Sequence, residues 1–349
     1  MATRTDTRKR NLVNKAAQLS RKQFGEDAGA KFLRAYYANV PPADIAAMDA
    51  ETLSAAANSC FRFAQKRLAG EPLVRVFNPR QADHGWDGRH TVIEVVTDDM
   101  PFLVDSITAE LNYQGLTVHL LVHPTFQVIR TPAGKMKTFT PCAADRAGNE
   151  SFMHFEVNEQ ADPKILAYLK GRLERVLQDV SAAVEDWKSI RGQAATILND
   201  LDSSPPKAAK AEISETRAFV EWMLEDHFTF LGYREYDYVG SSAKQKLKVR
   251  PGGLGVLRSS SRPIFKSWTD GASLSDEVCS LICQPNLAMV AKGSQRAAVH
   301  RRVHLDVVGV KKFDSAGDVV GARIIVGLFT SAAYSLSPTR IPIVRRKIS

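Results

Sequence analysis

The residues best suited to binding chemistry lie together in a short segment near position 100. Two aspartates follow an apolar run, and a proline then precedes apolar residues at helical spacing, Leu103, Ile107 and Leu111. Backbone N–H groups at a helix N-terminus hold small anions, and carboxylates pair with an ammonium group. This turn is therefore a candidate site for an amino acid or another small-molecule effector, with contacts from Asp98, Asp99, Met100, Pro101, Phe102, Asp105 and Ser106.

The same turn also has a purely structural interpretation. Asp99 or its neighbour would cap the helix, and Pro101 would fix the first helical turn. Both interpretations stay open at the level of the sequence.

Two pairs of histidines have a spacing found in some metal sites, His119 with His123 and His300 with His304. On a helix, residues four apart could share an ion. Both pairs lie in strand-like sequence, where four residues span roughly 13 Å, too far for one ion. We therefore predict no metal site.

Other catalytic patterns are incomplete. Cys279 and Cys283 lack a second pair of ligands and are typical of apolar positions on an amphipathic helix. The glycines of residues 251–255 match neither a dinucleotide fingerprint nor a phosphate-binding loop, and they favour a turn beside a strand. No nucleophile-elbow pattern occurs. We therefore predict no catalytic residue in this chain.

The elements that position the turn are a strand, a helix and a second strand. Residues 91–98 form an apolar strand, the helix stops at Gly115, and residues 116–122 alternate as a strand again. Further strands at 73–77, 126–129 and 152–157, followed by a long helix, give the order β-α-β-β-α with a sheet covered on one side. That is a ferredoxin-like arrangement.

This arrangement resembles an ACT domain, the small amino-acid-sensing module of many metabolic enzymes. In such modules the turn usually faces a neighbouring copy, and the two copies together form the pocket. ACT-like modules carry glycine where this chain has Phe102. Phe102 is therefore also a candidate residue for a protein interface.

The rest of the chain predicts helices over 11–69 that pack on the next domain, a short helix over 274–283, an aromatic strand over 228–238 and a hairpin turn at 314–317. The strands after residue 213 resemble a PAS-like sensor fold. The fold class is α+β. An N-terminal helical segment (1–72) precedes a ferredoxin-like ACT domain (73–190), a linker (191–212) and a PAS-like, mostly antiparallel α+β domain (213–336). Residues 337–349 are expected to start a helix that leads into a missing remainder.

The net charge of +9 is concentrated at the two ends of the chain. Residues 1–22 hold seven basic residues and one acidic residue, and the last ten hold four basic residues. A nucleic-acid-binding domain keeps such residues on a folded face, so we expect no nucleic-acid partner. No apolar run approaches the ~20 residues that span a bilayer, so we expect no membrane partner. Four cysteines without a disulfide framework favour the cytoplasm.

Three longer motifs carry a second resemblance, at residues 102–107, 221–233 and 327–335. They resemble the N-terminal region of the large bacterial NAD-specific glutamate dehydrogenases, which place ACT-like and PAS-like modules before a separate catalytic domain. For a longer parent protein, the resemblance implies NAD-dependent deamination of L-glutamate to 2-oxoglutarate and ammonia. NAD would be the cofactor of that parent, and the family's catalytic residues have no matching positions in this chain.

The expected role is therefore regulatory. An effector bound at the ACT-like turn or in a PAS-like cavity would shift the population of an active homo-oligomer. A rival role is a scaffold, in which Phe102 and the aromatic strand hold subunits together without a ligand. A self-sufficient enzyme is the third possibility, and it would require turnover by this chain itself.

Overall fold

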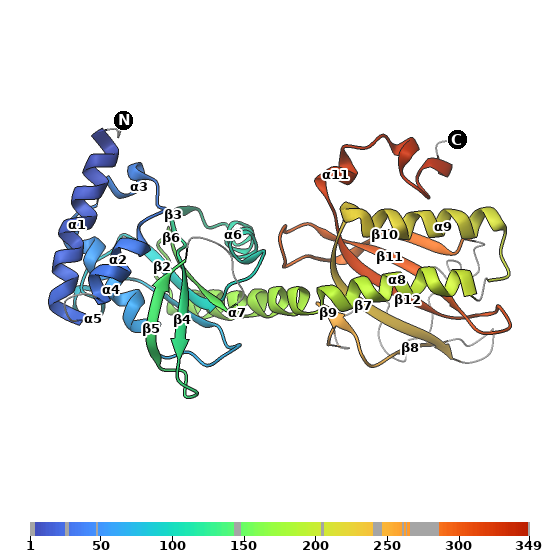
Figure 1. The fold of residues 1–349 in the computed structure, drawn as a ribbon, viewed down its shortest axis with the longest axis horizontal. Helices are drawn as coiled ribbons and strands as arrows, with labels where there is room; N and C mark the ends of the chain where they lie inside the picture. The colour runs from blue at the N-terminus through green and yellow to red at the C-terminus, as the bar shows by residue number, and fades with distance from the viewer. Residues whose placement is uncertain are drawn as a thin grey trace. The chain divides into compact units, whose positions relative to one another are not determined.

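The computed structural model describes residues 4–24, 28–46, 48–142, 148–203, 206–239, 246–259, 262, 264–265 and 286–347 (Figure 1). The chain divides into two compact units, Met1–Leu177 and Gln178–Ser349. The division falls within helix α7 (Pro163–Glu185), whereas the sequence placed the end of the first sheet domain at residue 190. Within the described residues, no helix is both long and apolar enough to cross a membrane.

The first unit begins with a helical layer that packs on a sheet. Asp49 caps one of its helices by accepting a hydrogen bond from the backbone N–H of Thr52 at 2.6 Å. Phe32 of this layer belongs to one continuous core with Phe126 and Phe152 of the sheet, which confirms the predicted packing of the helical segment. The helices of the layer are α1 (Arg4–Phe24), α2 (Ala28–Tyr36), α3 (Pro42–Ala46) and α4 (Ala50–Phe63).

The sheet of the first unit is antiparallel between neighbours, in the order β1-β2-β6-β4-β5, with β3 also beside β6. Because β2 and β3 both run antiparallel to β6, they are parallel to each other, and helix α6 (Leu103–Tyr113) connects them. The predicted β-α-β unit is confirmed, with β6 inserted between its two strands. The strands are β1 (Leu73–Phe77), β2 (His90–Asp98), β3 (Val118–Val122), β4 (Thr125–Arg130), β5 (Met136–Pro141) and β6 (Asn149–Asn158); the short helix α5 (Gln81–His84) lies between β1 and β2.

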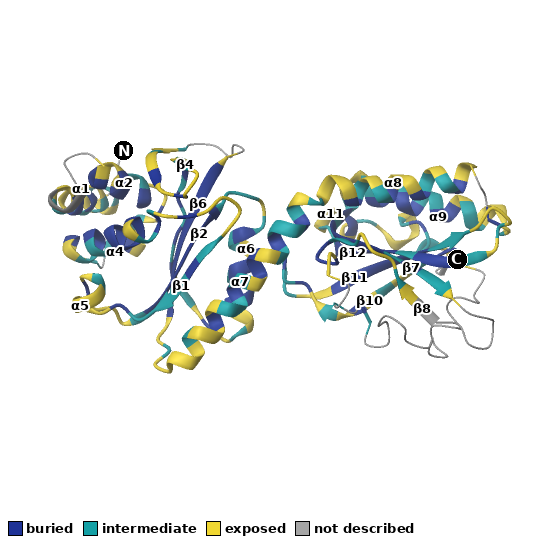
Figure 2. Ribbon diagram, turned by 90° about the horizontal axis from the view of Figure 1, so that it is seen from below, coloured by how far each residue is buried: buried dark blue, intermediate teal, exposed yellow. Residues whose placement is uncertain are grey.

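Both faces of this sheet are covered, which differs from the one-sided sheet that the sequence predicts. Figure 2 shows β2 and β6 between the helical layer on one side and α6 with the first part of α7 on the other. Residues along β2 are buried at almost every position, because neither face meets water. The edge beside β2 is taken by β1, which precedes the β-α-β-β-α run. The chain after α7 continues as a helix instead of a further strand of this sheet.

The second unit is an antiparallel sheet in the order β10-β11-β12-β7-β8, with the short strand β9 also beside β7. Helices α8 (Trp187–Ser203) and α9 (Lys210–Trp222) share its core. The predicted hairpin turn is confirmed, since Gly317 N–H donates to Asp314 O at 3.0 Å. The strands are β7 (Phe228–Val239), β8 (Lys246–Val249), β9 (Leu254–Gly255), β10 (Ala288–Arg296), β11 (His304–Phe313) and β12 (Val319–Phe329), and a π-helical turn η1 (Met223–His227) precedes β7.

The segment predicted as a linker is largely helical. Ile190, Ala194, Ile197 and Leu201 of α8 are buried in the core of the second unit. Their spacing is that of the apolar face of an amphipathic helix, so the prediction of a linker over these residues is wrong.

The aromatic strand lies in the core, whereas the scaffold hypothesis requires it at the surface. Phe228, Phe230 and Tyr233 of β7 are 1–3 % exposed and pack in the core shared with α8 and α9. They are therefore not contact surfaces for another subunit. The whole of the predicted short helix over 274–283, with Cys279 and Cys283, lies outside the described residues.

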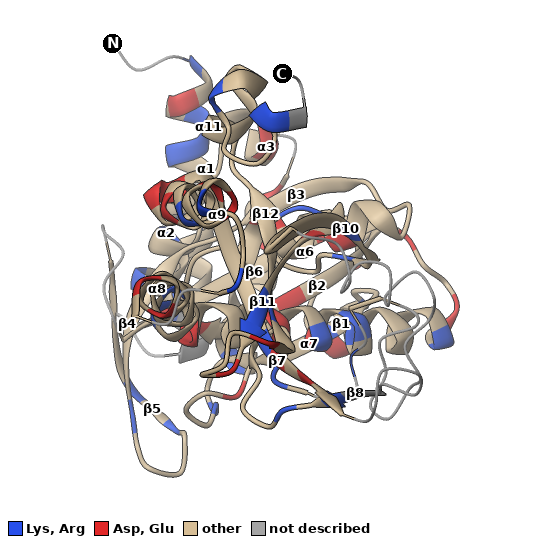
Figure 3. Ribbon diagram, turned by 90° about the vertical axis from the view of Figure 1, so that its right-hand side faces the viewer, with Lys and Arg blue, Asp and Glu red and all other residues tan. Residues whose placement is uncertain are grey.

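The last described residues do not form the predicted helix. After the short helix α11 (Ser331–Tyr334), the chain makes two 3-10 turns, η2 (Pro338–Arg340) and η3 (Arg345–Lys347). Ile341 and Ile343 pack against the core of the second unit, and Arg345 donates two hydrogen bonds to Glu215 of α9, at 2.8 and 2.7 Å. Figure 3 shows basic positions on α1 and on these terminal turns, where the sequence concentrates its positive charge.

Candidate functional site

The acidic turn connects β2 to α6 and has an unusual backbone. Asp98 is the last residue of β2, and Phe102 precedes the helix with a φ of 72°, in the left-handed region. A residue with a Cβ is strained there, whereas glycine is not. The glycine that ACT-like modules carry at this place therefore matches the conformation of the turn. Because Phe102 is the N-cap residue, the expected aspartate cap is wrong.

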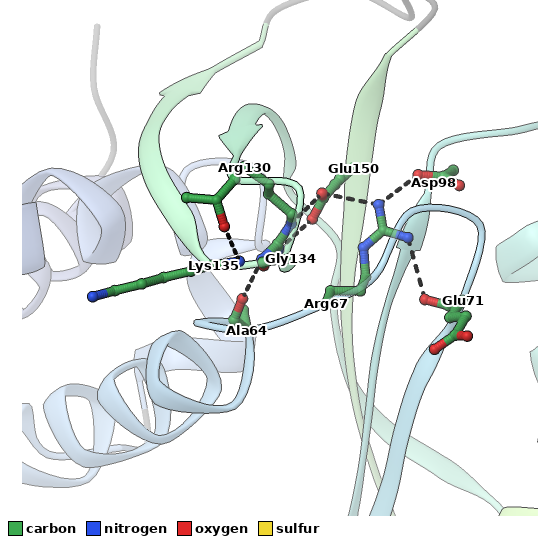
Figure 4. A network of polar contacts seen from close by, with 9 residues as sticks. Ala64, Arg67, Glu71, Asp98, Arg130, Gly134, Lys135 and Glu150 are labelled. Atoms are coloured by element: carbon green, nitrogen blue, oxygen red, sulfur yellow. Dashed lines mark hydrogen bonds and ion pairs between the residues drawn. The ribbon is translucent and has the colours of Figure 1, made fainter.

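Asp98 forms an ion pair with Arg67, a residue from the connection between α4 and β1. Arg67 Nη2 lies 2.5 Å from Asp98 Oδ1 and 2.9 Å from Glu150 Oε1 of β6 (Figure 4). The Arg67 side chain is 3 % exposed, whereas that of Asp98 is 47 % exposed. The buried Arg67 guanidinium is thus shared by a buried carboxylate, Glu150, and a half-exposed one, Asp98.

Glu150 is fixed from its other side by Arg130 of β4. Arg130 Nε and Nη2 each donate to one Glu150 oxygen at 2.7 Å, the two-pronged geometry that holds a carboxylate most firmly. Burial raises the pKa of the Glu150 carboxyl, but the hydrogen bonds from Arg130 and Arg67 outweigh it, so that pKa lies below its ordinary value. Glu150 is therefore ionised at neutral pH.

The second aspartate of the turn is also engaged within the unit. Ser151 Oγ donates to Asp99 Oδ1 at 2.5 Å, and Asp99 N–H donates to Asn149 O at 2.8 Å. His123 Nε2 lies 3.1 Å from the same Ser151 hydroxyl. In a hydrolytic triad the imidazole stands between serine and aspartate and takes the serine proton. Here the serine stands in the middle and its hydroxyl donates a hydrogen bond to Asp99, so the imidazole is not held between serine and aspartate as in a triad.

The structure brings part of the predicted set together. Asp98 and Asp99 lie side by side in the chain but face different partners, while Ser106 is buried and Asp105 and Pro101 are exposed. Met100 and Phe102 are partly buried.

Some residues of the site were not predicted from the sequence. They are the residues around the two carboxylates, Arg67, Glu150, Arg130 and Ser151. A signal for Glu150 and Ser151 exists, because they are polar residues directly before the apolar strand residues that begin at Phe152.

A second polar cluster lies deeper in the same unit. His154 Nδ1 lies 3.3 Å from Glu94 Oε1, and His154 Nε2 lies 3.6 Å from Glu156 Oε1. Arg75 Nε donates to Glu94 at 2.7 Å, and His90 Nδ1 lies 2.9 Å from Glu156. Burial lowers the pKa of His154, but the hydrogen bonds with Glu156 and Glu94 outweigh it and raise the pKa to about 9. His154 is therefore a charged residue in the core.

The remaining sequence candidates have structural surroundings. His119 stacks on His90 with ring centroids 4.5 Å apart. Gly255 lies in β9, which pairs with β7 and confirms a turn beside a strand; a Cβ there would stand 2.1 Å from Leu231 O. Among the residues that the structure describes, no group of three or more His, Cys, Asp or Glu side chains could hold a metal ion.

Comparisons with known proteins identify the family of this unit. Residues 32–173 match the family model for the ACT1 domain of glutamate dehydrogenase, a match that begins within α2 and so includes α3 and α4 of the helical layer. The NAD-specific glutamate dehydrogenase of Halomonas elongata is 35 % identical over 321 residues, which are 91 % of this chain and 20 % of that protein.

Two further relatives carry the same description. The protein of Pseudomonas aeruginosa is 31 % identical over 83 % of this chain and 18 % of its own length. That of Mycobacterium tuberculosis is 26 % identical over 82 % of this chain and 16 % of its own length. The chain spans about a fifth of the length of the curated relatives that it matches. It is homologous to the NAD-specific glutamate dehydrogenases and contains, over residues 32–173, the ACT1 domain of that family.

Proposed function

We propose that this chain is the N-terminal regulatory and oligomerisation portion of a large NAD-dependent glutamate dehydrogenase and is not itself catalytic. The parent protein would convert L-glutamate, NAD and water to 2-oxoglutarate, ammonia and NADH. The chain would bind an amino acid or another small-molecule effector at the acidic turn and self-associate. Effector binding would then bias the parent toward one of its states. The homology over nine-tenths of the chain supports this role.

One observation carries the sensing part of the proposal. Within the ACT1 domain, two carboxylates sit at the junction of β2 and the N-terminus of α6, beside a buried arginine. This junction offers a negative partner for an ammonium group and a positive partner for a carboxylate. Those are the two groups that every amino acid carries.

The scaffold remains the second candidate, and because the aromatic strand is buried, other exposed residues take its place beside Phe102 as candidate contacts. Tyr113 at the end of α6 is 56 % exposed, and Ile165 and Tyr168 at the start of α7 are 40 % and 52 % exposed. Exposed aromatic and large apolar residues of this kind are typical of contact surfaces between proteins.

Calorimetry separates the two candidates. The 349-residue chain is titrated with a panel of L-amino acids and small carboxylates, as wild type and as the Asp99→Asn variant. The control is Glu159→Gln, an exposed carboxylate near the opposite end of β6. Sensing predicts heat for at least one ligand, reduced by Asp99→Asn and unchanged in the control.

Two further measurements complete the test. A chain that gives no heat with any ligand, yet sediments as a stable oligomer that Tyr168→Glu dissociates, is a scaffold. An assay with L-glutamate and NAD is expected to show no turnover by this chain. Turnover would refute the non-catalytic role.

A further inference from the structure

Arg67 combines burial, charge and one replaceable partner. Its Nη2 bonds to Glu150 and Asp98, its Nη1 donates to Glu71 O at 3.2 Å, and its backbone N–H donates to Gly134 O at 3.0 Å. These contacts fix the guanidinium from several directions. Glu150 is held in turn by two hydrogen bonds from Arg130, so it cannot leave without breaking both.

Asp98 is the weak member of this set. Its contact with Arg67 is a single ion pair, and nearly half of its side chain faces water. Exposed ion pairs contribute little net free energy, because water solvates the separated carboxylate almost as well. Of the two carboxylates that contact Arg67 in the described part of the chain, Asp98 is therefore the one that can exchange for another carboxylate at little cost.

The geometry points to Arg67 as the carboxylate receptor of the acidic turn, with Asp98 as an internal carboxylate that occupies it until a ligand arrives. The ligand class is an α-amino acid. Its carboxylate would take the place of Asp98 on Arg67, and its ammonium group would pair with the released Asp98. This assignment rests on the proposed function and names the residues and the ligand chemistry of that site.

Charge balance explains why a zwitterion fits better than a simple anion. Inserting a zwitterion between Arg67 and Asp98 leaves each charge with a partner of opposite sign. A simple carboxylate would release Asp98 with nothing to pair with, next to Glu150 and to the incoming anion. Like charges in a partly buried site repel each other, so wild-type protein should discriminate against anions that lack an ammonium group.

A ligand inserted between Arg67 and Asp98 would also loosen the contact between the turn and the helical layer. Arg67 lies in the connection between the helical layer and β1, and this connection pairs with the β4–β5 hairpin, as Gln65 O accepts a hydrogen bond from Met136 N–H at 2.9 Å. Asp98 ends the strand that leads into α6. The ion pair between Arg67 and Asp98 therefore ties the turn to the helical layer, and a ligand that separates them loosens that tie.

The test compares ligands that differ only in the ammonium group: L-alanine with propionate, and L-glutamate with glutarate. The variant is Asp98→Asn, which keeps the size of the side chain and removes its charge. Calorimetry on the 349-residue chain is expected to show about threefold to fivefold tighter binding of propionate and glutarate, because the internal competitor is weakened. The two amino acids should bind about tenfold more weakly, because their ammonium group loses a charged partner. Glu159→Gln should change neither.

The outcomes distinguish this assignment from the proposed function. If wild-type protein binds an amino acid and Asp98→Asn shifts amino acids and simple acids by the same factor, the Arg67 assignment fails while sensing stands. If wild-type protein binds none of the probes but Asp98→Asn binds propionate or glutarate, Arg67 is a receptor and amino-acid sensing fails. If neither protein binds any probe, both fail. Equal thermal midpoints for the two proteins confirm that the variant is folded.

Discussion

Two charged clusters lie on the same face of the same pair of strands, and they differ in their access to water. Alternate residues of a strand share a face, so Glu94 and Asp98 of β2 and Glu150 and His154 of β6 all point toward the helical layer. The side chains of Glu94 and His154 are 0 % and 2 % exposed, whereas Asp98 is 47 % exposed. The buried pair Glu94–His154 stabilises the fold, whereas the half-exposed Asp98 can exchange for a ligand.

The energetic reason is the cost of an unpaired charge. Removing one partner of a sealed ion pair leaves the other charge in a medium that solvates it poorly. Removing the half-exposed partner Asp98 leaves Arg67 paired with Glu150. The comparison therefore predicts large stability losses in the His154 cluster and small ones at Asp98.

The largest effect is expected from His154→Gln. This change leaves Glu94 and Glu156 close together in the core without the cation between them. The free energy of unfolding should fall by about 3–5 kcal/mol. Urea unfolding followed by circular dichroism measures it, with Glu159→Gln as the unaffected control. A loss below about 1 kcal/mol would show that the sealed cluster is no more important to stability than a surface pair.

The pH dependence of stability should report the same histidine. Its pKa is raised from 6.5 to about 9 in the folded protein, so folding favours the protonated form. The contribution is complete below pH 6.5 and is lost as the pH rises through about 9. It amounts to roughly 3 kcal/mol. Urea unfolding at intervals from pH 6 to pH 10 tests this, and a His154→Gln chain should show a flatter profile over the same interval.

A smaller effect should come from the backbone that supports Arg67. Gly134 has a φ of 80°, and a Cβ there would stand 2.4 Å from Arg67 O. Gly134→Ala should therefore cost about 2 kcal/mol, from backbone strain and from the displaced connection. Gly115→Ala is the matched control, since Gly115 has a φ of 78° but nothing within 4 Å of its Cβ position. Equal losses in the two variants would mean that the contact with Arg67 contributes nothing.

The smallest effect is expected at the open cluster. Asp98→Asn should change the free energy of unfolding by less than about 1 kcal/mol, because Arg67 keeps its ion pair with Glu150 and the half-exposed Asp98 carboxylate contributes little. The same urea titration measures it. A loss as large as that of His154→Gln would place Asp98 among the structural charges and remove the contrast between the two clusters.

Local sequence patterns predicted those elements whose apolar residues recur at short spacing. The strand up to Asp98, the helix from Leu103 and the stop at Gly115 are visible because each has one polar boundary and a regular apolar face. Helix α8 has the same kind of apolar face, with Ile190, Ala194 and Ile197 at helical spacing, but the serine- and proline-rich residues that follow it favoured the prediction of a linker. The local pattern failed for the terminal segment, where the core of the second unit holds Ile341 and Ile343 in turns instead of a helix.

What the sequence determined by itself is the acidic turn, because a strand, two aspartates, a proline and a helix follow one another within a few residues. What the tertiary structure decided is which partner each aspartate contacts and how far it is exposed. Arg67 precedes Asp98 by 31 residues, and Ser151 follows Asp99 by 52. Such partners meet because β2 pairs with β6 and the helical layer closes over that face. Packing of the whole unit therefore leaves the Asp98 carboxylate half-exposed and buries that of Glu150. No local sequence pattern encodes this difference.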